Sequence, residues 1–150
     1  MAVSAHDVAA YILSRRTRMS AMKLQKLVYY AQAWSLVWDD RRLFPERIEA
    51  WANGPVVREL YERHRGQFEV DGWPWGNADR LDADARETVD AVIAYYGGRN
   101  AQWLSDLTHS EAPWIDARAG VPDGERSDRE ISLACMMEYY SSLREDGGEG

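Results

Sequence analysis

The sequence is poor in the residue types that most often build catalytic and metal centres. It contains one cysteine and three histidines among 150 residues. A single thiol excludes an intramolecular disulfide framework and a zinc site built from several cysteines, and it fits a reducing compartment. None of the histidines belongs to an HExxH or HxxxH pair, the spacing that places two imidazoles on one helix face.

The chain also lacks a long apolar run, an excess of positive charge and a phosphate-binding loop. No stretch is apolar over the length that a membrane-spanning helix needs. The opening segment, MAVSAHDVAAYILSRR, lacks the basic-then-apolar order of a secretory signal. The net charge of −7 repels nucleic-acid backbones. We therefore expect a cytoplasmic protein that binds no membrane and no cofactor and does not take nucleic acid as its primary partner.

Aromatic residues, in contrast, are abundant. Seven tryptophans and eight tyrosines occur in a chain that is 45% apolar, enough for one domain with its own core. Seven tryptophans exceed what such a core needs, and Trp and Tyr are enriched where proteins bury one another's side chains. The candidate partner-binding residues are Tyr30, Trp34, Trp73 and Trp75. Trp73 and Trp75, in a Trp-Pro-Trp loop, are expected to be the most exposed.

Helical periodicity predicts an all-α single domain with about six or seven helices and at most a short β segment near Ile48–Trp51. The domain is predicted to span residues 1–144, and residues 145–150 to form a flexible acidic tail. Ser4 and Asp7 have the spacing of a capping box, in which a hydroxyl and a carboxylate bind free backbone N–H groups. The first helix is therefore predicted over residues 5–16.

The central core helix is predicted to follow Ser20, which can cap it. One face carries apolar or small residues at helical spacing: Leu24, Leu27, Val28, Ala31, Ser35 and Trp38. Aromatic side chains extend this face: Tyr29, Tyr30 and Trp34. The polar exceptions are expected on the remaining sector: Lys23, Lys26 and Gln32. A helix this apolar is usually buried by several neighbours.

Turn and cap residues delimit the later helices. Pro55 suits the first turn of a helix over residues 56–65, which Gly66 would end. Further helices are predicted from Asp82 to Gly97, from Asn100 to Leu107 and around Pro113.

The last helix is predicted to begin at a second capping box, formed by Ser127 and Glu130. Its inward face would comprise the following residues: Ile131, Ala134, Cys135, Met136, Tyr139 and Leu143. On that face, Cys135 is interpreted as a small buried hydrophobic residue and not as a nucleophile.

His109 and Glu111 form the one pair that suggests catalysis. They could share a metal ion or act as a base and the group that orients it. A metal site would need further ligands, which the sequence does not nominate. We therefore favour a structural role, in which His109 bonds to backbone at a helix junction and Glu111 begins the next helix.

Two motifs in order along the chain resemble those of the Panacea domain family, also called the antitoxin SocA-like domain. The first motif comprises Lys23-Leu24-Gln25-Lys26-Leu27, Tyr30-Ala31-Gln32, Leu43-Phe44, Ile48-Glu49-Ala50-Trp51 and Gly54-Pro55-Val56-Val57. The second is LTHSEAPWIDAR, from Leu107 to Arg118. The resemblance covers roughly residues 5–140, because ISLACMMEYY also fits the family's terminal helix.

This resemblance implies an antitoxin that neutralises a toxin by direct protein contact. The toxin would be encoded nearby, often in a prophage or another mobile element of bacteria. The family is not known for enzymatic activity or for a cofactor, so the chain is not expected to be an enzyme. Most motif residues are interpreted as a structural hub: Trp51, Asn53, Gly54, Pro55, His109, Glu111, Pro113 and Trp114.

Two other functions stay open at this point. The chain could be an adaptor that delivers a partner to a protease or another machine, with the acidic tail from Glu145 to Gly150 as a handle. It could also be an enzyme centred on His109 and Glu111. The missing catalytic constellation and the surplus of aromatic residues favour the antitoxin.

Overall fold

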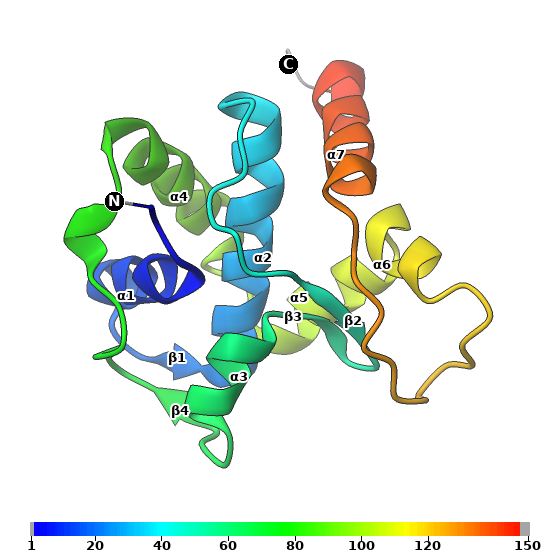
Figure 1. The fold of residues 1–150 in the computed structure, drawn as a ribbon, viewed down its shortest axis with the longest axis horizontal. Coiled ribbons are helices and arrows are strands. Elements are labelled where there is room, and N and C mark those ends of the chain that lie inside the picture. The colour runs from blue at the N-terminus through cyan, green and yellow to red at the C-terminus, as the bar shows by residue number, and fades with distance from the viewer. Residues whose placement is uncertain (1, 148–150) are drawn as a thin grey trace.

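Helix α2 (Ala21–Trp38) runs through the middle of the molecule in a computed structural model that describes residues 2–147 (Figure 1). The Ser20 hydroxyl begins the helix by accepting a hydrogen bond from the Lys23 backbone N–H, at 3.1 Å. Most of its side chains are buried, because neighbours pack around nearly its whole circumference. The predicted core helix and its cap are confirmed.

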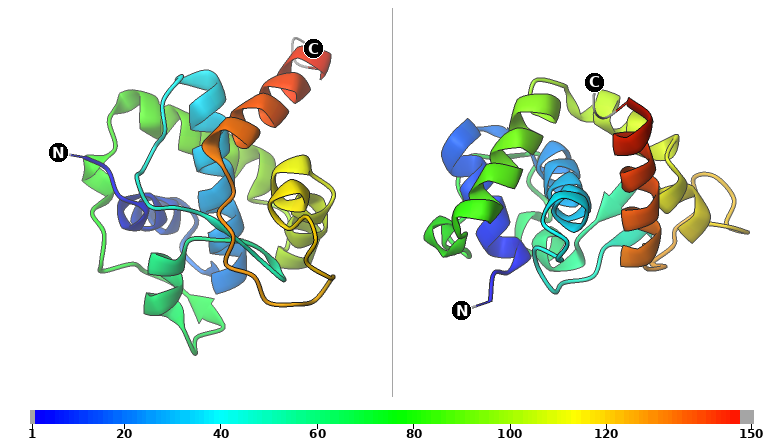
Figure 2. Two further views of the ribbon diagram at one scale, coloured as in Figure 1. Left: turned by 45° about the vertical axis from the view of Figure 1, so that its right-hand side comes forward. Right: turned by 90° about the horizontal axis from the view of Figure 1, so that it is seen from above.

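The other helices surround α2. Within residues 2–147 the chain has seven α-helices and one short 3₁₀ helix. Besides α2 they are α1 (Ala5–Arg16), α3 (Arg58–His64), η1 (Ala78–Arg80), α4 (Ala83–Tyr96), α5 (Ala101–His109), α6 (Ala112–Ala117) and α7 (Leu133–Gly147). Helices α1 and α4 lie on one side of α2, and α7 lies on the other (Figure 2). The prediction of a mostly helical single domain is confirmed, and no helix of the described residues is long and apolar enough to cross a bilayer.

The strands are short and form two separate pairs. Strands β2 (Glu49–Trp51) and β3 (Gly54–Val56) form an antiparallel hairpin, in which Trp51 pairs with Gly54. Strand β2 confirms the predicted β segment. The second pair, β1 (Met19–Ser20) with β4 (Glu69–Val70), was not predicted. Two residues are too few to produce an alternating pattern that a sequence can reveal.

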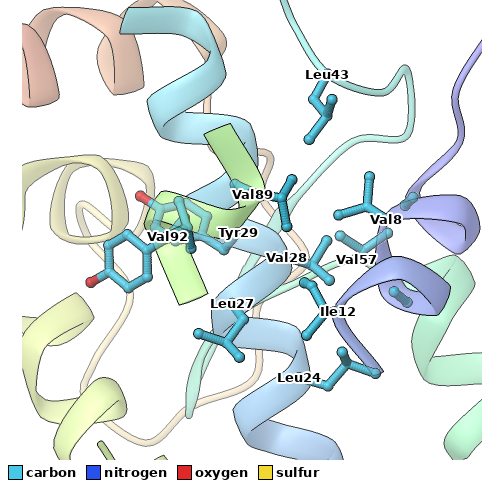
Figure 3. Packing of buried hydrophobic residues seen from close by; sticks show 14 of the residues in the cluster. Val8, Ile12, Leu24, Leu27, Val28, Tyr29, Leu43, Val57, Val89 and Val92 are labelled. Atoms are coloured by element: carbon cyan, nitrogen blue, oxygen red, sulfur yellow. The ribbon is translucent and has the colours of Figure 1, made fainter. Parts of the chain in front are cut away.

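The core lies where α1, α2 and α4 meet (Figure 3). Val8 and Ile12 of α1 face Leu24 and Val28 of α2, and Val89 of α4 closes the layer. All five side chains are fully buried. Each contributes about 1.5–3 kcal/mol relative to full exposure. The predicted capping box of α1 is also present, since Ser4 and Asp7 each accept a hydrogen bond from the other's backbone N–H.

Two buried glutamines attach irregular segments to α2. The Gln32 amide accepts a hydrogen bond from Leu43 N at 2.6 Å and donates one to Phe44 O at 2.8 Å. The Gln25 amide pairs in the same way with both backbone groups of Val57, at 2.9 and 3.2 Å. The prediction that Gln32 and Lys26 lie on a polar sector of α2 is wrong, since each is 1% exposed. The Gln25 and Gln32 amides supply the hydrogen-bond partners that the backbone of a non-helical segment otherwise lacks.

Pro55 does not begin a helix. It lies in β3, and α3 begins only at Arg58. Because Gln25 holds Val57 in an extended conformation, the two valines before Arg58 cannot join the helix. The predicted end of this helix is confirmed, since Gly66 has a φ of +86° just beyond the capping residue Arg65.

Helix α7 begins later than predicted. It starts at Leu133, and the hydroxyl of Ser132 accepts a hydrogen bond from Cys135 N at 3.0 Å. The predicted capping box at Ser127 and Glu130 is absent, because Glu130 instead forms an antiparallel bridge with Glu49. The chain thus remains extended beside β2 before it can turn into a helix.

The inward face of α7 also differs from the predicted one. Met136 and Tyr140 are fully buried, whereas Ala134 and Leu143 are exposed and Cys135 is half-buried. Met136 is buried as predicted, while Tyr140 takes the buried position expected for Tyr139. Of the predicted tail, residues 145–147 belong to α7, and residues 148–150 lie outside the described residues.

Candidate partner-binding site

A buried carboxyl group joins the central helix to the C-terminal half of the chain. Glu111, the residue before α6, accepts hydrogen bonds on one oxygen from Tyr30 Oη at 2.8 Å and Tyr140 Oη at 2.7 Å. Burial raises the pKa of Glu111, and the two tyrosine hydroxyls partly offset this effect. The network continues to Tyr29, whose hydroxyl lies 3.0 Å from that of Tyr140.

His109 does not join this carboxyl group. Its ring stacks on Trp114 with centroids 4.1 Å apart, and its Nε2 atom is buried without a hydrogen-bond partner among the described residues. Burial and the nearby Lys26 ammonium lower the pKa of His109. The structure thus shows no hydrogen bond between His109 and Glu111, and the described side chains of residues 2–144 contain no group of three or more His, Cys, Asp or Glu placed to hold a metal ion.

The side chain of Lys26 extends from α2 to the β2–β3 hairpin. Burial lowers the pKa of its ammonium group to about 8. Gly54 leaves room for this side chain: its φ is +129°, and a Cβ atom there would lie 2.6 Å from Lys26 Cε. The glycine of the first motif is therefore required both by its backbone conformation and by the lysine packed against it.

Residues of the second motif connect the β2–β3 hairpin to α6 through hydrogen bonds. Trp114 Nε1 donates a hydrogen bond to Trp51 O at 2.9 Å, and Arg118 Nη1 donates one to Ala50 O at 2.9 Å. Arg118 also bonds to the carbonyl of Pro122, which fixes the loop that leads to α7. The predicted meeting of the central helix, the glycine-proline turn and the Pro-Trp junction is present, although it consists of two neighbouring clusters, one at Glu111 and one at Trp114.

Four aromatic side chains and one leucine from three helices form a partly exposed surface, which we name the aromatic patch. Its members are Trp34 and Trp38 of α2, Tyr95 of α4, and Tyr139 and Leu143 of α7. Trp34 stacks on Trp38 at 4.8 Å and bonds through Nε1 to Tyr96 Oη at 3.0 Å. The buried Tyr96 contacts Tyr95 at 4.7 Å, and the buried Tyr140 links Trp34 to Tyr139, so the rings of the patch are connected through these two tyrosines.

The exposed fractions within the aromatic patch are large for apolar groups. Trp38 is 45% exposed, Tyr95 72% and Leu143 39%. The two helices that contribute its other members, α4 and α7, flank α2 (Figures 1 and 2). Trp34, a predicted partner-binding residue, is half-buried at the centre of the patch. Clustered exposed apolar side chains of this kind mark interaction surfaces.

The other predicted partner-binding residues have different positions. Tyr30 is fully buried and stacks on Tyr96, so the structure places it in the core and not on the surface. Trp73 is only 5% exposed, so its predicted exposure is wrong, whereas Trp75 is 42% exposed.

Trp73 is buried because its loop is attached to α1. Trp73 Nε1 donates a hydrogen bond to His6 Nδ1 at 3.1 Å, and Asn77 N donates one to Asp7 Oδ1 at 2.8 Å. Gly76 lies against α1 so closely that a Cβ atom would collide with the His6 carbonyl. These contacts join distant parts of the chain and have no local sequence signal.

A second surface feature is a groove of about 730 Å³, which we name the arginine groove. The start of α2, the β2–β3 hairpin, α3 and the loop before α7 form its walls. Its defining residues are Trp51, Arg58, Tyr61, Arg65, Arg126 and Asp128. His64 lies at its buried side, and burial lowers the pKa of this imidazole. Sequence reasoning missed this groove, because its walls come from four separate segments.

The buried polar residues Gln25, Gln32, Tyr140 and Arg118 were also missed as structural determinants. Their signal in the sequence is membership of the motifs: Gln25 and Gln32 belong to the first motif, Arg118 ends the second, and Tyr140 ends ISLACMMEYY.

Comparison with known families agrees with the two motifs. Residues 24–115 match the model of a family described as "Antitoxin SocA-like, Panacea domain". Neither the curated proteins nor the solved structures include a significant match to this chain.

Proposed function

The chain belongs to the Panacea domain family of antitoxin SocA-like proteins, and on this premise we propose that it is an antitoxin that neutralises a cognate toxin by direct protein–protein binding. The toxin is a protein encoded nearby in a bacterial or phage toxin–antitoxin system. The family match is the observation that carries the proposal.

The aromatic patch supports a binding role. Interfaces take most of their energy from a few large aromatic anchors, and Trp38 and Tyr95 present such side chains at the surface. Their rings are supported from behind by Trp34 and Tyr96, so binding would order few additional rotamers. We assign the toxin-binding surface to this patch.

In this role the protein is neither an enzyme nor a cofactor-binding protein, because steric block of a toxin requires no catalysis and no cofactor from the antitoxin. The protein acts in the cytoplasm, where its toxin is made. Nucleic acid is not its primary partner, because a net charge of −7 opposes phosphate backbones.

Co-expression with the product of the adjacent gene tests the proposal. A tagged copy of this chain is expected to restore growth of cells that express the toxin and to co-purify with it. Unchanged toxicity together with no complex would refute the antitoxin function for this pair. A complex without rescue would favour the adaptor function instead.

Two tryptophans of nearly equal exposure provide a matched test of the interface. Trp38 is 45% exposed within the aromatic patch, and Trp75 is 42% exposed on the loop that covers α1. Trp38→Ala is expected to weaken toxin binding at least about tenfold, as loss of one aromatic anchor does, whereas Trp75→Ala leaves it unchanged. The reverse result would move the interface to the Trp-Pro-Trp loop.

A further inference from the structure

The arginine groove carries positive charge on a protein that is acidic overall. Arg58, Arg65 and Arg126 line it; among the described residues Asp128 is the one acidic residue that lines it, while the carboxylate of Glu49 in β2 is paired with Arg58. The chain as a whole has a net charge of −7. Positive charge concentrated in one groove attracts anionic ligands that the negatively charged remainder of the surface repels.

The three guanidinium groups are not equivalent. Arg58 is held by the buried carboxylate of Glu49 at 3.1 Å and lies over the Trp51 ring, 5.6 Å from its centroid. Arg65 and Arg126 are exposed, and among the side chains that the structure describes, those of residues 2–144, neither guanidinium group has a hydrogen-bond or ion-pair partner. Arg58 therefore shapes the wall, while Arg65 and Arg126 are available to a ligand.

Aromatic surface lies beside these charges. Trp51 and Tyr61 are half-buried and meet edge to face, with centroids 4.9 Å apart. Trp51 Nε1 is already bonded to Glu49 at 2.8 Å, so its ring is fixed in place. The groove thus combines two free guanidinium groups with a rigid apolar wall, and its volume of about 730 Å³ accommodates several side chains.

We propose that the arginine groove binds an acidic peptide segment. Arg65 and Arg126 hold its carboxylates through charge-assisted hydrogen bonds, and apolar side chains between them pack on Trp51 and Tyr61. The assignment of this segment to the toxin rests on the proposed function, whereas binding of an acidic peptide in the groove does not depend on it. If the segment belongs to the toxin, the arginine groove and the aromatic patch bind two regions of one partner.

A peptide titration tests the groove without the toxin. The probe is a short synthetic peptide of glutamate and leucine, added to the ¹⁵N-labelled full chain. The indole N–H signal of Trp51 is expected to shift to saturation, while that of Trp38 in the aromatic patch stays in place. A peptide of lysine and leucine should move neither signal.

A charge-neutral double variant supplies the control. Arg65→Gln with Arg126→Gln keeps polar side chains at two exposed positions and is expected to fold with an unchanged melting temperature. Its affinity for the acidic peptide should fall at least about tenfold. The matched variant Arg15→Gln with Arg18→Gln, which removes two arginines that do not line the groove, should bind as the natural chain does.

Other outcomes would overturn the proposal. An acidic peptide that leaves the Trp51 signal in place, or that binds the double variant equally well, would exclude the groove as its site. Inorganic phosphate that shifts the same signal while the peptide does not would identify a small-anion site instead. If growth rescue fails but the peptide binds in an arginine-dependent way, the antitoxin function is refuted and the groove assignment stands.

Discussion

Glu111 is the buried acid on which the α2–α6–α7 contact depends. Its pKa lies above the ordinary value of 4.5, mainly because the carboxyl group is buried. As the pH rises above 4.5, the unfolded chain loses this proton more readily than the folded chain, so the contribution of Glu111 to stability decreases through its folded-state pKa.

The variant Glu111→Gln tests this contribution. The amide oxygen can still accept from Tyr30 and Tyr140, but it does not titrate. We expect the variant to gain stability relative to the natural chain as the pH rises from about 4.5 towards 8. Urea unfolding at several pH values measures this difference, and a difference that is independent of pH would contradict it.

Gly54 has a conformation that other residues adopt only under strain. Its φ of +129° and the Lys26 side chain behind it both oppose a Cβ atom. Gly54→Ala is expected to lower the free energy of unfolding by about 1–3 kcal/mol.

Gly98→Ala is the control for Gly54→Ala, since Gly98 has no positive φ and open space at its Cβ position. Urea unfolding of the two variants side by side gives the comparison. Equal losses would mean that the φ angle and the Lys26 contact have no special cost.

At the scale of elements, the two glutamines of α2 act as substitutes for β-strand partners. Gln32→Leu would keep the volume of the side chain but leave Leu43 N and Phe44 O without partners in a buried place. Each unsatisfied group costs about 1–3 kcal/mol, so a loss of about 3 kcal/mol is expected.

Hydrogen exchange separates this effect from a general loss of stability. The Leu43 amide should lose protection in Gln32→Leu by more than the global change predicts. Gln102→Leu removes an exposed amide that bonds to Asp106 at 2.8 Å, and it is expected to change stability by less than about 0.5 kcal/mol. Retained protection of Leu43 would show that the glutamine does not hold this segment.

The helices were predictable where a local cap marks them. Ser4, Ser20 and Asp82 each accept a hydrogen bond from a backbone N–H of the first turn, as the sequence predicts. The start of α7 was not predictable, because Ser127 and Ser132 offer similar local signals. The bridge between Glu49 and Glu130 decides between them, and it joins residues far apart in the chain.

At the scale of the whole molecule, the candidate site could be predicted only in part. The central place of Trp34 follows from the apolar sequence of α2. The aromatic patch also needs Tyr95 of α4 and Leu143 of α7, which join the surface of α2 only after the three helices have packed. Likewise, the burial of Trp73 depends on His6 and Asp7, and nothing near Trp73 in the sequence indicates it.

Variants of Trp73 and Trp38 should therefore distinguish a loss of stability from a loss of toxin binding. Trp73→Ala removes a buried ring and its hydrogen bond to His6, so we expect a loss of about 3–5 kcal/mol in the free energy of unfolding. Trp38→Ala removes a ring that is 45% exposed and contacts Trp34 on one face. Its loss should stay below about 1.5 kcal/mol.

Urea unfolding and toxin affinity, measured on both variants, check this separation. Because a destabilised chain can also bind poorly, toxin affinity of Trp73→Ala is measured at low temperature, where circular dichroism shows it folded. There it should approach that of the natural chain, while Trp38→Ala stays weak. If Trp73→Ala were as stable as Trp38→Ala, the contacts of its loop with α1 would contribute little to the fold, and Trp73 would return as a candidate for the partner surface.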